Sequence, residues 1–198
     1  MSVFANISRR LRLPFSGGEI NALSFWVSQF IMVLATILGV YLASSEGLKA
    51  AVKFNEITRI ERNYYLRTSY ANELEANADI VLSYAAQIKD SPPGYKFYDL
   101  NPLVLDQFVW TAMKESEATL ETPSHFLQGG QSFYRYVKDT YKKLADKTFG
   151  HSHGAKLLIE AAIDIKEHLV PKIRQNTAVL QQQLKTQGVE VDVDDQIN

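Results

Sequence analysis

The chain has 198 residues, a formal net charge of −1 at pH 7 and no cysteine. Without thiols it has no disulfide, no thiolate metal ligand, no c-type haem attachment and no cysteine nucleophile. The near-neutral charge supplies no general attraction to nucleic acid, so nucleic acid is not expected among its partners, and no motif indicates a cofactor.

Residues 1–21 form a short basic segment in which Arg9, Arg10 and Arg12 lie among apolar residues. Pro14 and the Ser-Gly-Gly run at 16–18 are expected to break the chain before the next element. Such a segment either lies in the membrane interface with its arginines near anionic headgroups, or only sets the topology of the span that follows. The sequence leaves both interpretations open.

Residues 22–43 contain no charged side chain. A helix that rises about 1.5 Å per residue needs roughly 20 apolar residues to cross the hydrocarbon core, and it hydrogen-bonds its own backbone there. We therefore predict a transmembrane helix. Because the run exceeds the roughly 7–15 apolar residues of a cleaved signal peptide, we expect an uncleaved signal anchor, with cleavage before Glu46 as the alternative.

The charges that flank residues 22–43 indicate an orientation. The basic residues before the span are nearly undiluted, whereas those after it alternate with acidic residues. We expect the N-terminus in the cytoplasm and the rest outside, as in a bacterial inner-membrane protein with a periplasmic domain. Small residues recur on one face of the span and are a candidate packing face for another membrane helix. They are Ser24, Ser28, Ala35, Gly39 and Ala43.

Residues 44–90 are expected to form one long helix. Apolar positions advance alternately by three and four residues, which is the spacing of a heptad seam. The seam consists of Ile57, Ile60, Tyr64, Ala71, Leu74, Ala78, Val81, Ala85 and Ile88. Such a seam packs either inside one bundle or between two chains. Arg67 occupies a seam position, so it either contacts a ligand or partner, or packs its stem while its head reaches solvent or an internal acid.

Three further helices are expected, at about 102–121, 131–147 and 155–187. Asn101 followed by Pro102 predicts the start of the first, with Leu105, Phe108, Val109, Ala112 and Met113 buried. Gly129 and Gly130 are interpreted as a turn, Pro171 is expected to kink the last helix about one turn upstream, and Gly188 is expected to stop it. The tail at 189–198 is acidic and is expected to be flexible. The predicted class is all-α, with one transmembrane helix and an antiparallel four-helix-type bundle at 44–188.

Recognisable catalytic chemistry is sparse in this sequence. His151 and His153 flank one serine and are weak metal-ligand candidates, because zinc or copper normally needs a third and a fourth ligand. His168 has Ile165 three residues before it, not the glutamate of a di-iron bundle motif. The chain contains no HExxH, no phosphate-cradling glycine loop and no GxSxG elbow, so it is not expected to be an enzyme.

The layout of residues 22–187 is similar to the sensory half of bacterial four-helix chemoreceptors. Those receptors return through a second span to a cytoplasmic output domain, whereas here the chain ends. We therefore expect a non-enzymatic, single-pass accessory subunit that contacts the bilayer and uses the small-residue face of the span and the heptad seam to join either other membrane subunits or a second copy of itself. The alternative is an extracytoplasmic ligand-binding or sensory bundle that signals through a partner, with Arg67 and the aromatic residues Tyr64, Tyr70 and Tyr84 as possible lining of a pocket.

Overall fold

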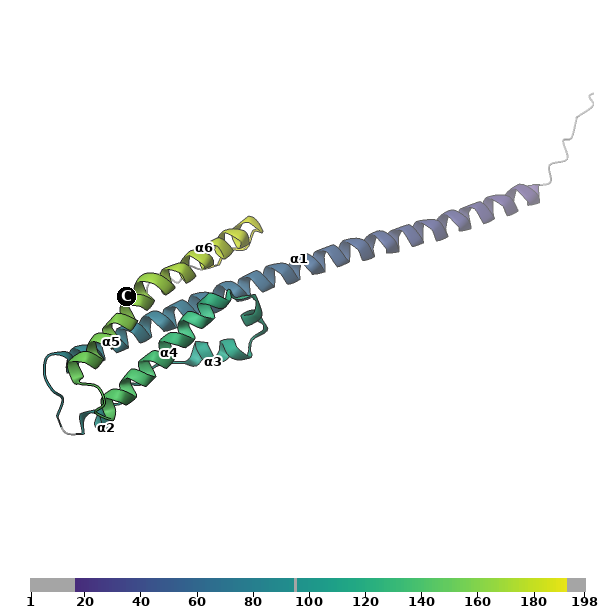
Figure 1. Cartoon of the computed structure of the whole chain (residues 1–198). Coiled ribbons are helices and arrows are strands. Elements are labelled where there is room, and N and C mark those ends of the chain that lie inside the picture. Colours follow the sequence, from purple (N-terminus) through teal and green to yellow (C-terminus); the bar gives the residue numbers. More distant parts are fainter. Residues whose placement is uncertain (1–16, 95, 192–198) are drawn as a thin grey trace, which may run out of the picture. The chain divides into compact units, whose positions relative to one another are not determined.

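In the computed structural model, the described residues are 17–94 and 96–191, with side chains described from Leu23 onward (Figure 1). Every regular element in that part of the chain is helical and none is a strand, which confirms the predicted all-α class. The chain divides into unit 1, residues 1–53, and unit 2, residues 54–198. Most of the predicted basic segment at 1–21, and residues 192–198 of the predicted tail, lie outside the described residues.

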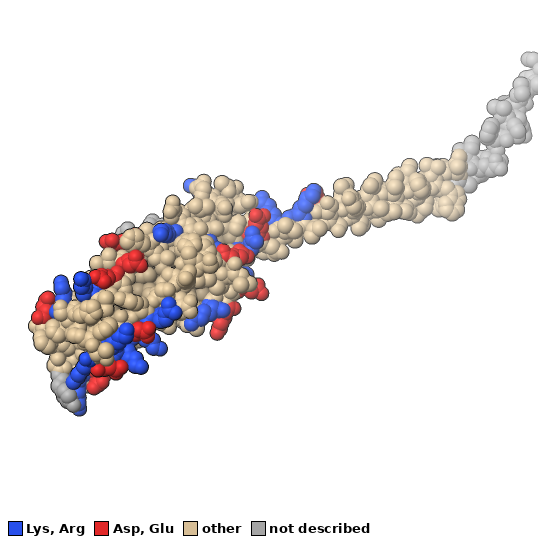
Figure 2. Space-filling view, viewed as in Figure 1, with Lys and Arg blue, Asp and Glu red and all other residues tan. Residues whose placement is uncertain are grey.

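Helix α1 (Gly17–Lys89) begins at the predicted break and contains the whole apolar run. Side chains from Leu23 to Ala43 are all exposed, and this stretch carries no charge on the face shown in Figure 2. Its length and composition make it the one helix of the described chain that could cross a membrane. The small-residue face is open within unit 1, and nothing lies within 4 Å of where a side chain at Gly39 would be.

Unit 2 is built from the second part of α1 and the elements that follow it. These are α2 (Phe97–Leu100), α3 (Phe108–Glu115), the 3-10 helix η1 (Glu117–Glu121), α4 (Ser124–Ala145), α5 (His151–Asp164), the π turn η2 (Ile165–Leu169) and α6 (Val170–Thr186). Helix α4 packs against both α5 and η2. The larger of two apolar clusters joins α1, α4 and α5.

Contacts between the elements give the direction of each segment. Along α1, Tyr70 contacts the start of α4 and Asn77 contacts Tyr134 further along it, so α4 runs in the same direction as α1. The chain from α5 to α6 returns in the opposite direction: His151 lies against Ile88, whereas Asn176 lies against Arg67. The residues between α2 and α4 must also run back along α1.

The predicted helix at 102–121 is where the structure differs most from the sequence analysis. Residues 102–107 have no regular structure, α3 covers only Phe108–Glu115, and a separate 3-10 turn follows Ser116. Of the five residues expected to be buried, only Met113 is; Phe108 is 84% exposed. We call residues 101–121 the crossover segment.

The glycine pair at 129–130 lies inside α4, not in a turn, so that prediction is wrong. A Cβ on Gly130 would stand 1.7 Å from the Tyr70 hydroxyl, and one on Gly129 would stand 2.8 Å from the Leu169 side chain. The glycines therefore serve close packing of α4 against α1 and η2. Helix α4 consequently begins seven residues before the predicted start, at Ser124.

The last predicted helix, at 155–187, is present as the continuous run α5, η2 and α6, which begins at His151. Where a kink is expected upstream of Pro171, the structure has the π turn η2. Gly188, with φ of 80°, ends α6, and the Val189 amide bonds back to the Leu184 carbonyl at 3.0 Å. Val191 then packs on Tyr64 and Leu184, so the predicted tail begins as a packed segment.

Candidate functional site

The heptad seam lies inside unit 2. From Tyr64 to Ile88 its members are buried, while Ile57 and Ile60 are half-buried. The seam packs against residues of α4 and α5, among them Val137 and Leu158. Of the two possibilities left open by the sequence, the structure shows packing within one chain, so the seam does not supply the surface for a partner.

Arg67 connects three elements of unit 2 by hydrogen bonds. It is 5% exposed, and its terminal nitrogens donate to the Asn176 side-chain oxygen and to the Glu121 backbone carbonyl, both at 2.6 Å. Burial lowers the pKa of Arg67, and the nearby Glu121 charge opposes this shift. The head thus reaches oxygens inside unit 2 and ties α1 to η1 and α6.

A groove of about 400 Å³ lies beside Arg67 and is also lined by Arg59, Asn63 and Glu121. The Nε of Arg67 and the Oδ1 of Asn63 are buried and have no hydrogen-bond partner in the described part of the chain. One unpaired donor and one unpaired acceptor therefore remain next to this groove.

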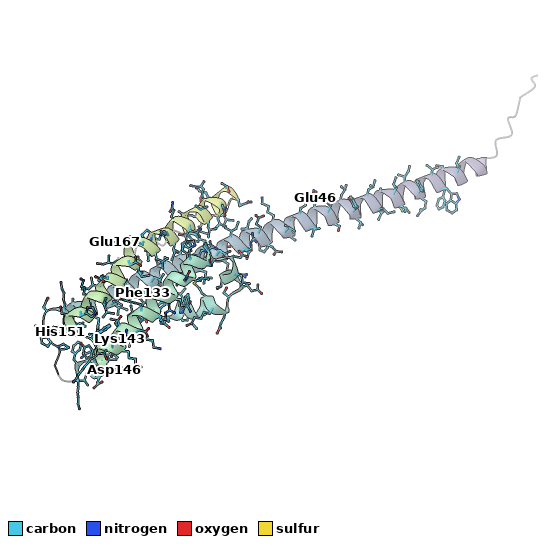
Figure 3. The ribbon with its side chains drawn as sticks, in the orientation of Figure 1. Glu46, Phe133, Lys143, Asp146, His151 and Glu167 are labelled. Atoms are coloured by element: carbon cyan, nitrogen blue, oxygen red, sulfur yellow. The ribbon has the colours of Figure 1, made fainter. Side chains whose placement is uncertain are left out.

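The histidines do not converge. His151 Nδ1 lies 2.9 Å from the Ile88 carbonyl, and the His153 ring meets the edge of Phe149. His151 lies at the same end of unit 2 as Lys143 and Asp146 (Figure 3). No group of three or more His, Cys, Asp or Glu residues could hold a metal ion among the described residues.

A row of polar residues on α1 was recognised only in part from the sequence, which singled out Tyr70 and Tyr84 but not the two asparagines. Asn63, Tyr70, Asn77 and Tyr84 recur every seven residues beside the seam, and all are buried. Burial raises the pKa of Tyr70 and of Tyr84 above the usual 10.0. The heptad spacing of these residues was readable, but polar side chains at flanking positions usually indicate a solvated face.

Glu73, next to this row, is the central residue of a buried network. It is 8% exposed, and its carboxylate accepts hydrogen bonds from the Val109 amide at 2.6 Å and the Trp110 amide at 3.0 Å. These are the second and third residues of α3, whose N-cap residue Gln107 makes no side-chain cap. The carboxylate of α1 therefore caps α3 from another part of the chain.

Asn77 and Tyr134 complete the network. The Asn77 side chain donates to the Asp106 carbonyl at 2.6 Å and accepts from the Asp106 amide at 2.8 Å. Both backbone groups of Asp106 are therefore paired with this one side chain. The Tyr134 hydroxyl donates to Glu73 at 2.8 Å. Burial, reinforced by Glu73, raises the pKa of Tyr134. Buried polar groups of α1 thus hold the backbone of a segment in which only Phe108–Glu115 is α-helical.

The crossover segment held in this way turns large apolar side chains outward. Leu120 is 91% exposed, Phe108 84% and Val104 67%, and Leu100 just before the segment is 75% exposed. Scattered single exposures are ordinary, but four large apolar side chains exposed within about twenty residues make this region a candidate for docking. We call these four residues the exposed apolar set.

A hollow of about 720 Å³ lies between α3, η1 and α4. Met113 and Tyr134 in its lining are buried, and Trp110 is half-buried. Lys114 and Lys138 are among its exposed lining residues. The arrangement suits binding of another molecule, because an apolar base and a charged rim are typical of recognition sites.

No known protein family, no curated protein sequence and no solved structure matches this chain.

Proposed function

We propose that this protein is a non-enzymatic, single-pass accessory subunit of a larger membrane assembly. The apolar part of α1 anchors it in the bilayer, and unit 2 presents the exposed apolar set to another subunit or to a second copy. The observation that carries the proposal is the crossover segment: buried Glu73 and Asn77 hold its backbone while Phe108 and Leu120 face outward.

The buried and the exposed apolar residues differ in what they offer to a partner. The seam is buried, so it is already satisfied within the chain. An exposed apolar set costs solubility, and a fixed backbone reduces the entropy lost when such a set binds a partner. Small residues on the span add a second packing surface, this one within lipid. Together these features support an assembly role more directly than a catalytic one.

Extraction in mild detergent followed by mass measurement tests the proposal. We expect a complex heavier than one chain in its detergent micelle. Replacing Phe108 and Leu120 by serine should release the subunit without unfolding it, because both side chains are almost fully exposed. Val179 to serine, on α6 and 54% exposed, is the matched control. A solitary monomer at every concentration would contradict the proposal.

The proposed orientation places the N-terminus in the cytoplasm and unit 2 outside, in a bacterial inner membrane. The cysteine-free chain makes this measurable, because one cysteine can be introduced at Ser8 and, in a second variant, at Lys172. A membrane-impermeant maleimide added to intact spheroplasts should label the cysteine at 172 only. Labelling at position 8 alone would reverse the assignment.

The groove beside Arg67 favours a second candidate, a ligand-binding or sensory bundle that signals through a partner. The unpaired Arg67 Nε and Asn63 Oδ1 offer one donor and one acceptor to a small polar molecule. A thermal-shift screen of small organic acids tests it. A stabilising acid whose effect is lost in Arg59→Gln, at the exposed edge of the groove, would support this candidate; no stabilisation by any acid would remove it.

A further inference from the structure

The hollow between α3, η1 and α4 has a preformed apolar base. The Trp110 ring is stacked on Tyr70 with centroids 5.8 Å apart, and it also lies 5.9 Å from the Tyr134 ring. Tyr134 and the Trp110 amide are both bonded to Glu73. Because these groups are already fixed by buried partners, a ligand that enters the hollow does not have to order them.

The edge of the hollow is positively charged. Lys114, Arg135 and Lys138 line it against a single carboxylate, that of Asp139. Lys114 lies over the Trp110 ring, 5.3 Å from its centroid. None of the three cations forms an ion pair with the described residues, whereas Lys166 and Arg174 elsewhere on unit 2 are paired with carboxylates.

The same crossover segment supplies both the hollow and much of the exposed apolar set. Gln107 and Thr119 line the hollow, and their chain neighbours Phe108 and Leu120 are among the most exposed apolar residues of unit 2. A small molecule would occupy the hollow alone, but only a macromolecule covers the hollow together with the apolar residues beside it. Three cations around a hollow with an aromatic base complement an acidic segment with a large apolar side chain.

We propose that the hollow docks an acidic segment of a partner protein, with an apolar side chain of that segment against Trp110 and carboxylates facing Lys114, Arg135 and Lys138. The proposal rests on the proposed function, since it names the chemistry of the partner. It specifies one contact of the assembly, so the assembly can exist while this contact is absent.

Fluorescence of Trp110 can report the binding directly. The chain has two tryptophans, and the Trp26→Phe variant leaves Trp110 as the sole one. The full chain in mild detergent is titrated with a short synthetic peptide that alternates glutamate and aspartate with leucine and phenylalanine. We expect a saturable change in emission that weakens several-fold as salt is raised from about 0.05 to 0.5 M, because exposed charges are screened.

Variants that remove positive charges test whether the peptide binds at the hollow. Arg135→Gln combined with Lys138→Gln should weaken the peptide about tenfold, because two exposed charge contacts are lost. Lys172→Gln combined with Lys185→Gln is the matched control, since it removes two exposed cations from α6 and should change the affinity less than twofold. A peptide with serine in place of its apolar residues should bind at least tenfold more weakly.

Several results would overturn the inference. They are no binding of the acidic peptide, equal binding of a lysine-for-acid version, and equal loss in both charge-variant pairs. Binding of vesicles rich in anionic lipid through the same two cations, without peptide binding, would assign the hollow to a membrane surface instead. If the peptide fails while the detergent complex persists, the inference is wrong and the proposed function stands.

Discussion

Replacing Glu73 by glutamine should loosen the crossover segment while leaving its shape almost unchanged. In the wild type, one carboxylate oxygen takes the Trp110 amide and the Tyr134 hydroxyl, and the other takes the Val109 amide. A glutamine that keeps its oxygen toward Trp110 and Tyr134 must place an NH₂ group against the Val109 amide, so two donors face each other.

The expected loss in the free energy of unfolding follows from this arrangement of hydrogen bonds. One hydrogen bond to a charged group contributes about 1.5–3 kcal/mol, and a buried donor left unpaired costs about 1–3 kcal/mol. Val109 is half-buried, so water can partly replace the lost acceptor. We therefore expect Glu73→Gln to lower the free energy of unfolding of unit 2 by about 2–3 kcal/mol. Amide exchange at Val109 and Trp110 should accelerate more than in α4.

Denaturant unfolding of the full chain in mild detergent, together with hydrogen exchange, measures both effects. The matched control is Glu75→Gln, the same change two residues away on α1. Glu75 pairs with Arg174 on the surface, where their side chains are 38% and 55% exposed, so its loss should cost less than about 1 kcal/mol. If Glu73→Gln costs no more than Glu75→Gln and protection at Val109 persists, the carboxylate does not hold α3 and the reasoning fails.

Three further changes have defined outcomes. Gly130→Ala drives a methyl group into the buried Tyr70 hydroxyl and should destabilise unit 2 by about 1–3 kcal/mol in denaturant unfolding, whereas Gly47→Ala, with open space around it, should be neutral or raise helicity. Gly188→Ala should cost about 1 kcal/mol by the same measurement because the backbone there has φ of 80°. The pKa of Tyr134 is raised in the folded state, so above about pH 10 the folded state keeps a proton that the unfolded state releases. The free energy of unfolding is therefore fully present below about pH 10. Above it, the free energy of unfolding should fall by about 1.4 kcal/mol per pH unit for each tyrosine with a raised pKa. Unfolding titrations in Tyr134→Phe should show a shallower fall; an unchanged slope would contradict this assignment.

The candidate site was only partly visible in the sequence. Arg67 was conspicuous because it breaks an apolar seam, and the structure places its head against Asn176 and Glu121. Glu73 and Asn77 were not conspicuous, because they lie beside the seam where charged and polar residues are normally solvated. Their roles depend on backbone groups more than 25 residues further along the chain, and no local pattern encodes such a pairing.

The single helix predicted at 102–121 is absent for a related reason. Its local signals were sound, since Asn101-Pro102 is a common helix start and an apolar spacing follows. Local signals supply only weak preferences, however, and tertiary hydrogen bonds outweigh them. Asn77 fully pairs the Asp106 backbone unit, and Glu73 caps α3 at its second and third residues, so the helix begins at Phe108.

By itself, the sequence determined the features that depend only on amino-acid composition and on the spacing of apolar residues. An uncharged run at 22–43 is apolar in any fold, and a seam that advances by three and four residues is satisfied only by a helix. Only the tertiary structure decided that Gly129 and Gly130 allow α4 to pack closely against α1 and η2, that the crossover segment is not one continuous helix, and that Phe108 faces outward. Each depends on which distant residue supplies a neighbouring atom or a hydrogen bond, and that pairing exists only after the chain has folded.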